Sequence, residues 1–149
     1  MIANPVVTTM LNRKSIRRYT SELPSNEVVE TIVRAGQQAP FAGQLGSLLL
    51  ARNKPNPFDA PLLFTICVDL HRLELIMARR GWKLVMNDLS ILFFGIQDAA
   101  LMAENMVIAA ESVGMGSCYL GINPRRVTQI AKQYKLPKGV YPLVELVMG

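Results

Sequence analysis

The clearest hydrophobic pattern in the chain lies between residues 89 and 121, where an apolar run passes into a helical repeat. Polar pairs recur seven residues apart in this stretch: Gln97 and Asp98, Glu104 and Asn105, and Glu111 and Ser112. Because seven residues are nearly two helical turns, these pairs form one narrow stripe on a helix that is otherwise Ala, Met, Leu, Ile and Val. The pattern therefore predicts a buried central helix at about residues 91–113.

Glycines end this helix and shape the segment after it. Gly114 and Gly116 suit a C-terminal cap and a tight exit. The next five residues, 117–121, are β-prone and end on another glycine. A strand that ends on glycine can bring bare backbone N–H groups close to a ligand. Residues 117–121 are therefore a candidate ligand-contacting strand.

The remaining elements are predicted from caps, breakers and apolar spacing. Helices are predicted to begin at Pro5, after the cap residue Ser25, at Leu70 and at Pro124, and strands at residues 47–51, 62–68 and 141–148. We expect the helix from Leu70 to continue to Met86. Two prolines between residues 53 and 61 predict a turn there rather than a helix.

These helices imply two surface assignments. The last helix has an apolar face, so its cations are expected to face water: Arg125, Arg126, Lys132 and Lys135. Trp82 is expected either to cap a pocket or to pack in a dimer interface.

Composition bounds the class of protein. A chain of 149 residues predicts a single domain over residues 1–149. Apolar residues are 50% of the chain, and counting the ten glycines raises this to roughly 57%, against a usual 45–50%. The excess predicts a buried partner surface and hence an oligomer. No charge-free apolar run approaches the ~18–20 residues of a membrane span, and the N-terminus lacks the order of a signal peptide, so we expect a cytoplasmic protein without a membrane partner.

Cysteine and histidine content argues against a metal centre. Cys67 and Cys118 lie far apart and form no CxxC pair, and Cys67 sits in an apolar run where a buried thiol is usual. His71 is the only histidine, so neither a His-based zinc site nor a His-based catalytic dyad is expected. We expect both cysteines to be structural.

The net charge of +5 is partly concentrated in residues 13–18, which hold four cations and a serine. If Ile16 points inward from an extended segment, Arg13, Ser15 and Arg17 project together on the other side. Two guanidinium groups and a hydroxyl on one side make a phosphate clamp, because the Arg fork matches phosphate oxygens. The alternatives are a solvated basic loop and a small nucleic-acid-binding protein. The dispersed cations and the lack of aromatic–basic interleaving speak against nucleic acid.

Taken together, these motifs resemble the FMN-dependent nitroreductase family. The early Arg-x-Ser-x-Arg pattern is matched by Arg13, Ser15 and Arg17, within RKSIRRYTSELP, and a second helix ends in AGQQAPFAG. The late signature, an Asp-Ala-Ala helix followed by Gly-x-Gly and a further glycine, is matched by Asp98, Ala99, Ala100, Gly114, Gly116 and Gly121. The resemblance covers nearly all of the chain.

The resemblance implies an α/β (α+β) three-layer sandwich, with a mostly antiparallel central sheet flanked by helices, whose protomers form an intertwined homodimer with FMN at the interface. Reduced nicotinamide, NADH or NADPH, would pass hydride to the flavin, which would reduce a nitroaromatic, quinone or similar acceptor. Arg13, Lys14, Ser15 and Arg17 would hold the phosphate and ribityl chain, and backbone around Tyr119, Leu120 and Gly121 would reach the flavin ring. The loop of Pro40, Phe41 and Gln44 would line the ring from the partner chain. No side chain is expected to act as a catalytic acid or base.

The chain also departs from the family pattern. Relatives usually carry Ser, Asn and Gln-Pro-Trp in the loop after the second helix, where this chain has Phe41, Gln44 and 46–48. The connection at residues 53–60 is short, and the C-terminal arm that embraces the partner is missing. These departures motivate an alternative: a degenerate flavin-binding protein of the same fold with little turnover. They leave open whether the chain is a natural short protein or a fragment.

Overall fold

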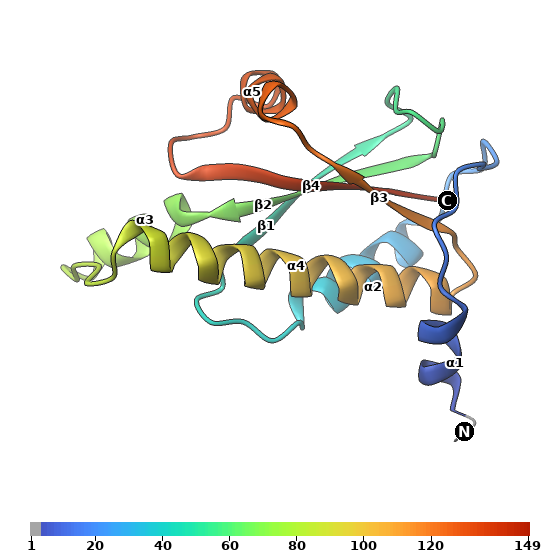
Figure 1. The fold of residues 1–149 in the computed structure, drawn as a ribbon, viewed down its shortest axis with the longest axis horizontal. Helices are drawn as coiled ribbons and strands as arrows, with labels where there is room; N and C mark the ends of the chain where they lie inside the picture. The colour runs from blue at the N-terminus through green and yellow to red at the C-terminus, as the bar shows by residue number, and fades with distance from the viewer. Residues whose placement is uncertain (1–3) are drawn as a thin grey trace.

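The structure is a computed structural model that describes residues 4–149 (Figure 1). Its elements in chain order are α1 (Pro5–Asn12), α2 (Asn26–Gln37), β1 (Gly46–Arg52), β2 (Leu62–Asp69), α3 (Leu70–Arg79), α4 (Asp88–Ser112), β3 (Ser117–Gly121), α5 (Pro124–Gln133) and β4 (Val140–Met148). The predicted helix starts at Pro5, after Ser25 and at Pro124 are confirmed: the side chains of Asn4, Ser25 and Asn123 each accept hydrogen bonds from backbone N–H groups in the first turn of their helix.

The four strands form one antiparallel sheet in the order β1-β2-β4-β3. Figure 1 shows α2 and α4 on one face of this sheet and α5 on the other, so the predicted three-layer arrangement of helices around an antiparallel sheet is confirmed. The β2–β4 register shifts between Ile66 and Cys67, where Pro142 stands opposite Cys67. A bulge suits that position because proline has no N–H to donate to the ladder.

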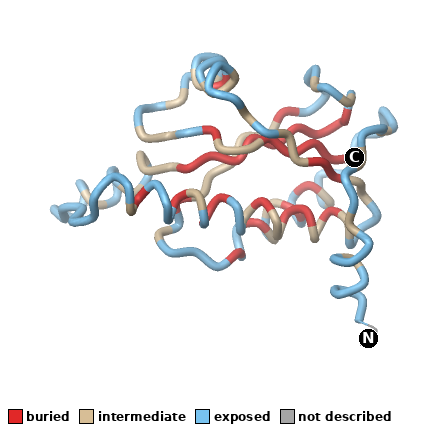
Figure 2. Tube along the Cα trace, in the orientation of Figure 1, coloured by how far each residue is buried: buried red, intermediate tan, exposed pale blue. Residues whose placement is uncertain are grey.

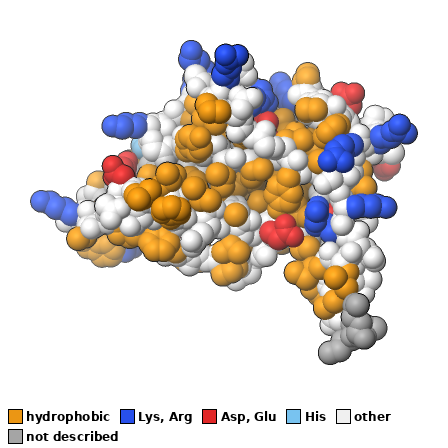
Figure 3. All heavy atoms as spheres, viewed as in Figure 1, with side chains coloured by type: hydrophobic (Ala, Val, Ile, Leu, Met, Phe, Trp, Pro, Cys, Tyr) orange, Lys and Arg blue, Asp and Glu red, His pale blue; other side chains and the backbone are white. Residues whose placement is uncertain are grey.

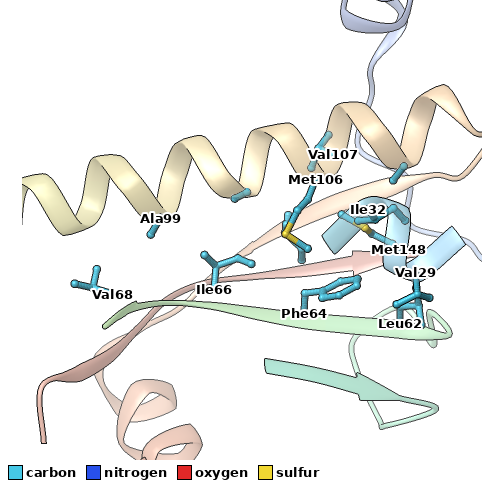
Figure 4. Packing of buried hydrophobic residues seen from close by; sticks show 13 residues of the cluster. Val29, Ile32, Leu62, Phe64, Ile66, Val68, Ala99, Met106, Val107 and Met148 are labelled. Atoms are coloured by element: carbon cyan, nitrogen blue, oxygen red, sulfur yellow. The ribbon is translucent and has the colours of Figure 1, made fainter. Parts of the chain in front are cut away.

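Helix α4 packs across the sheet and carries the core. Its buried side chains meet those of β2, β4 and α2, and Figure 4 shows Met106 and Val107 of α4 lying over Ile66 and Phe64 of β2. The predicted buried helix is therefore present, but most side chains of its first two turns are exposed, with Ile91 as a buried exception. Leu89, Leu92 and Phe93 are exposed, and Figure 2 shows the burial of the helix increasing toward its C-terminal half.

By length and apolar composition alone, α4 is also long enough to cross a membrane. Here it lies against the sheet, and a core helix of this length passes the same test. Its polar stripe of Asp98, Glu104 and Glu111 makes hydrogen bonds to other elements of the same chain.

Two sequence-based assignments are wrong. Helix α3 ends at Arg79 rather than Met86, because Gly81 adopts a left-handed φ of +66° that a helix cannot continue through. Arg126 does not simply face water: its guanidinium pairs with the buried carboxylate of Glu145 on β4, at 2.9 and 3.3 Å. This ion pair fixes α5 against the sheet.

Candidate functional site

The basic segment 13–18 is attached to the sheet through Ile16. The Ile16 N–H donates to the Ser117 carbonyl of β3 at 2.8 Å, and its carbonyl accepts from the Tyr19 hydroxyl at 2.7 Å. Ser15 and Ser117 form an isolated parallel bridge. Because side chains alternate along an extended segment, fixing Ile16 inward directs Ser15 and Arg17 to the opposite side. Both of these residues are exposed.

A glycine makes this attachment possible. A Cβ atom at Gly116 would lie 2.8–3.0 Å from three side-chain atoms of Ile16. Such distances are shorter than van der Waals contact, so only glycine lets the 13–18 segment lie this close to the entry of β3. The Gly-x-Gly pattern at 114–116 is thus partly explained by contact within the chain.

Strand β3 lies at the edge of the sheet. Gly116 and Gly149 exchange two backbone hydrogen bonds, of 2.7 and 3.2 Å. Because hydrogen-bonded pairs alternate with non-bonded pairs along an antiparallel ladder, the backbone N–H and C=O groups of residues 118 and 120 also face β4. By the same alternation the backbone groups of Tyr119 and Gly121 face outward, on the edge to which Ile16 is bound. A Cβ at Gly121 would meet nothing within 4 Å. Among residues 4–149, the outward N–H groups of Tyr119 and Gly121 face no further strand, because β3 pairs only with β4.

Arg13 is half-buried and contributes a cation with one buried donor atom. Its Nη1 is buried, and among residues 4–149 it has no hydrogen-bond partner. An unpaired buried donor is costly, and a guanidinium in this state favours an anionic ligand. Ser15 is bridged to Ser117, three residues from Leu120, which is about 10 Å along a strand. One flavin mononucleotide can therefore reach both the 13–17 segment and the end of β3.

The polar stripe of α4 orients β3. The Tyr119 hydroxyl donates to Glu104 at 2.8 Å, and the Ser117 hydroxyl donates to Glu111 at 2.8 Å. Burial raises the pKa of Tyr119 above its usual range, the hydrogen bond and charge of Glu104 raise it further, and the charge of Arg13 lowers it. The phenol therefore stays protonated and keeps donating to Glu104.

The loop at residues 40–45 lies elsewhere, along the first half of α4. Its Pro40, Phe41 and Gln44 line a pocket of about 490 Å³, together with residues of α2, β1 and α4. Three backbone N–H groups of the loop donate to the Asp98 carboxylate. Pro40, Phe41 and Gln44 therefore lie together at one pocket, as parts of a loop whose backbone is bound to α4.

Within one chain, this pocket and the 13–17 segment are well separated. Asp98 holds the loop and Glu111 holds Ser117, and thirteen residues of helix between them span about 20 Å. Lys14 also lies apart: it lines a second hollow with Ile16 and Glu111, on the inward side of its segment. The structure thus brings together Arg13, Ser15 and β3, and leaves the loop of residues 40–45 at a different place on the chain.

Sequence reasoning missed the contacts that Asp98, Glu104 and Glu111 make to the loop and to β3. Their signal was present, because a polar stripe on a helix buried in a core must find partners. Both cysteines are free and buried, as expected of structural thiols. Burial and the charge of Asp69 raise the pKa of Cys67 to about 12.

Known proteins resemble this chain over nearly its whole length. The nitroreductase family matches residues 10–51 and 47–149. The FMN reductase (NADPH) of Bacillus subtilis strain 168 is 29% identical over 163 residues, covering 98% of this chain and 66% of the relative.

Two solved structures have the same fold. NfrA2 of B. megaterium has a TM-score of 0.92 at 28% identity, over 99% of this chain and 66% of its own. The NADPH:FMN oxidoreductase from Vibrio harveyi, complexed with NAD+, has a TM-score of 0.87 at 25% identity, over 98% of this chain and 68% of its own. The chain spans just under two thirds of the length of the curated relatives it matches.

Proposed function

The chain belongs to the nitroreductase family, and we propose that it acts as an FMN-dependent oxidoreductase that uses NAD(P)H to reduce a nitroaromatic, quinone or similar acceptor. The observation that carries the proposal is the buried Nη1 of Arg13, unpartnered among residues 4–149, beside the free outer edge of β3. The FMN and NADPH in the names of the similar proteins support the same choice of cofactor and donor. Because NAD(P)H is a cytoplasmic coenzyme, a cytoplasmic location is part of the proposal.

The residues present fit an FMN phosphate at one end and its ring at the other. Arg13 would donate to phosphate oxygens from Nη1, and the exposed Ser15 hydroxyl and Arg17 guanidinium would add donors from the same side of the segment. Lys14, which lines a separate hollow, would contribute through its charge rather than by direct contact.

At the ring end, the outward N–H groups of Tyr119 and Gly121 are available as donors, whereas the Leu120 backbone faces β4 and would support the strand. Such pre-aligned donors stabilise developing negative charge, as an oxyanion hole does. Bound FMN would supply the hydride chemistry itself, and the chain's task would be to bind it, orient it and expose one face.

We also propose that FMN lies between two copies of the chain. The separation of about 20 Å between the loop and the clamp, worked out along α4, is bridged if the loop belongs to the partner. Large apolar side chains are exposed on α1 and from residue 82 into α4, including Val6 at 58% and Trp82 at 58% exposed. Figure 3 shows hydrophobic groups gathered over α1 and over the α3–α4 end of the molecule. Sedimentation equilibrium tests this point: a homodimer is expected, and a monomer at all concentrations would contradict it.

The function is tested by visible absorption and turnover. Purified protein incubated with FMN is expected to retain flavin absorption after gel filtration and to oxidise NADH or NADPH in the presence of a quinone. Protein that retains flavin without turnover would support the alternative, a degenerate flavin-binding protein. Protein that retains no flavin and releases a bound nucleic acid as salt rises would contradict both.

A further inference from the structure

The loop of residues 40–45 is held in shape by side chains of other elements. Asp98 of α4 accepts from the N–H groups of Ala42 at 2.6 Å, Gly43 at 3.0 Å and Leu45 at 2.9 Å. On the other side, the Arg72 guanidinium of α3 donates to the carbonyl of Gln44. The loop is therefore tied to two helices that are far from it in the sequence.

These ties impose a conformation that the loop would not keep alone. Gln44 has a left-handed φ of +54°, which is uncommon for a residue other than glycine. Asp98 is only 3% exposed, and a buried carboxylate requires hydrogen-bond donors. The three N–H groups meet this need, so the carboxylate and the loop stabilise each other.

The ties lie beside the pocket, because Asp98 and Arg72 line it together with residues of the loop. The residues whose N–H groups bind Asp98 are Ala42, Gly43 and Leu45, whereas those that line the pocket are Pro40, Phe41 and Gln44. Holding the first set fixes the direction of the second. The wall of the pocket is thus formed before any ligand arrives.

We propose that Asp98 is a positioning residue that preforms the wall against which the flavin ring binds, and that Arg72 assists it through Gln44. The proposal rests on the proposed function, because it takes the ring as the pocket's occupant. It assigns Asp98 no contact with the phosphate, which lies at the Arg13 end. Loss of Asp98 should therefore weaken flavin binding to the same extent whether or not the ribityl chain carries a phosphate.

FMN and riboflavin, which share the ring and differ in the phosphate, are the probes that separate these effects. Asp98→Asn keeps the size of the side chain but presents an NH₂ group to donors that need an acceptor. We expect the dissociation constants of FMN and riboflavin to rise by the same factor, roughly tenfold, which corresponds to the loss of about one charge-assisted hydrogen bond. In steady state, KM for the acceptor should rise more than kcat falls.

Asn105→Ala is the matched control. Asn105 lies on the same stripe and donates to the Ala35 carbonyl of α2 at 3.1 Å, and its substitution leaves the hydrogen bonds of the loop in place. It should lower the melting temperature and leave both dissociation constants unchanged. If Asp98→Asn does not fold, Arg72→Gln removes the tie to Gln44 from an exposed position, and a smaller rise, equal for both flavins, is expected.

Several outcomes overturn the inference. Folded Asp98→Asn protein that binds both flavins as the wild type does, or that loses affinity for FMN alone, contradicts it. So does Asn105→Ala protein with the same loss as Asp98→Asn, because the effect would then follow stability. Wild-type protein that binds neither flavin overturns the proposed function as well. Titration of the wild type alone shows this, so failure of the proposed function is distinguished from failure of the inference about Asp98.

Discussion

Replacing Arg13 should weaken FMN binding without lowering the stability of the flavin-free protein. In the flavin-free chain Nη1 of Arg13 is buried without a partner among residues 4–149, and an unsatisfied buried donor costs about 1–3 kcal/mol. Arg13→Met keeps the apolar stem of the side chain and removes that donor. We expect the free energy of unfolding of the flavin-free protein to stay unchanged or to rise by up to about 1 kcal/mol.

The same substitution should weaken FMN binding. A hydrogen bond to a charged partner contributes about 1.5–3 kcal/mol, so the dissociation constant of FMN should rise roughly ten- to a hundredfold. Riboflavin carries no phosphate, and its dissociation constant should hardly change. Fluorescence titration measures both constants, and urea unfolding followed by circular dichroism measures the stability.

Arg18→Met is the matched control for this experiment. Arg18 is exposed and lies in the same basic run, so the substitution removes the same charge without touching the buried donor. It should leave the ratio of the two dissociation constants close to that of the wild type. The proposed role of Arg13 is refuted if Arg13→Met destabilises the flavin-free protein by more than about 1 kcal/mol while the preference for FMN over riboflavin is unchanged.

Further substitutions test other parts of the site and the core. Gly116→Ala should displace Ile16, which its Cβ would meet at 2.8–3.0 Å, and so weaken FMN binding and lower the melting temperature. Gly121→Ala, whose Cβ meets nothing within 4 Å, should weaken flavin binding with the melting temperature unchanged; a fall in melting temperature equal to that of Gly116→Ala would contradict this. Tyr119→Phe removes the hydrogen bond to the α4 carboxylate and should lower stability by about 1–3 kcal/mol, as urea unfolding would measure. The pKa of Cys67 is raised to about 12 in the folded chain, so the protonated thiol contributes fully to the free energy of unfolding below about pH 8.5, the unfolded thiol's pKa. This contribution should be lost as pH rises toward 12. Cys67→Ala should make the free energy of unfolding fall less steeply with pH, and a pH profile equal to that of the wild type would contradict this prediction.

Much of the fold could be predicted because its signals are local. Caps at Asn4, Ser25 and Asn123 and the apolar run of β2 are each contained in a few consecutive residues. The apolar spacing predicts a helix longer than α3 because one glycine is tolerated inside many helices, and the sequence does not reveal that Gly81 takes a positive φ.

The contacts that build the site are the part that sequence patterns could not reveal. Asp98 is 56 residues from Ala42, to which it is hydrogen-bonded, and Arg126 of helix α5 pairs with a carboxylate on strand β4. A periodic stripe indicates that polar side chains share a face, but it does not say which elements meet them. The burial of Arg13 Nη1 likewise depends on packing that local patterns do not encode.

Amide NMR of isotope-labelled protein during titration with FMN tests most directly whether the basic segment and the edge of β3 hold one flavin, and the chain of 16.5 kDa suits the method. We predict that the largest shifts fall on residues 13–17, on Tyr119 and Gly121 at the outer edge of β3, and on the loop of residues 40–45. Shifts confined to other surfaces, such as α5, or no shifts at any FMN concentration, would contradict this prediction.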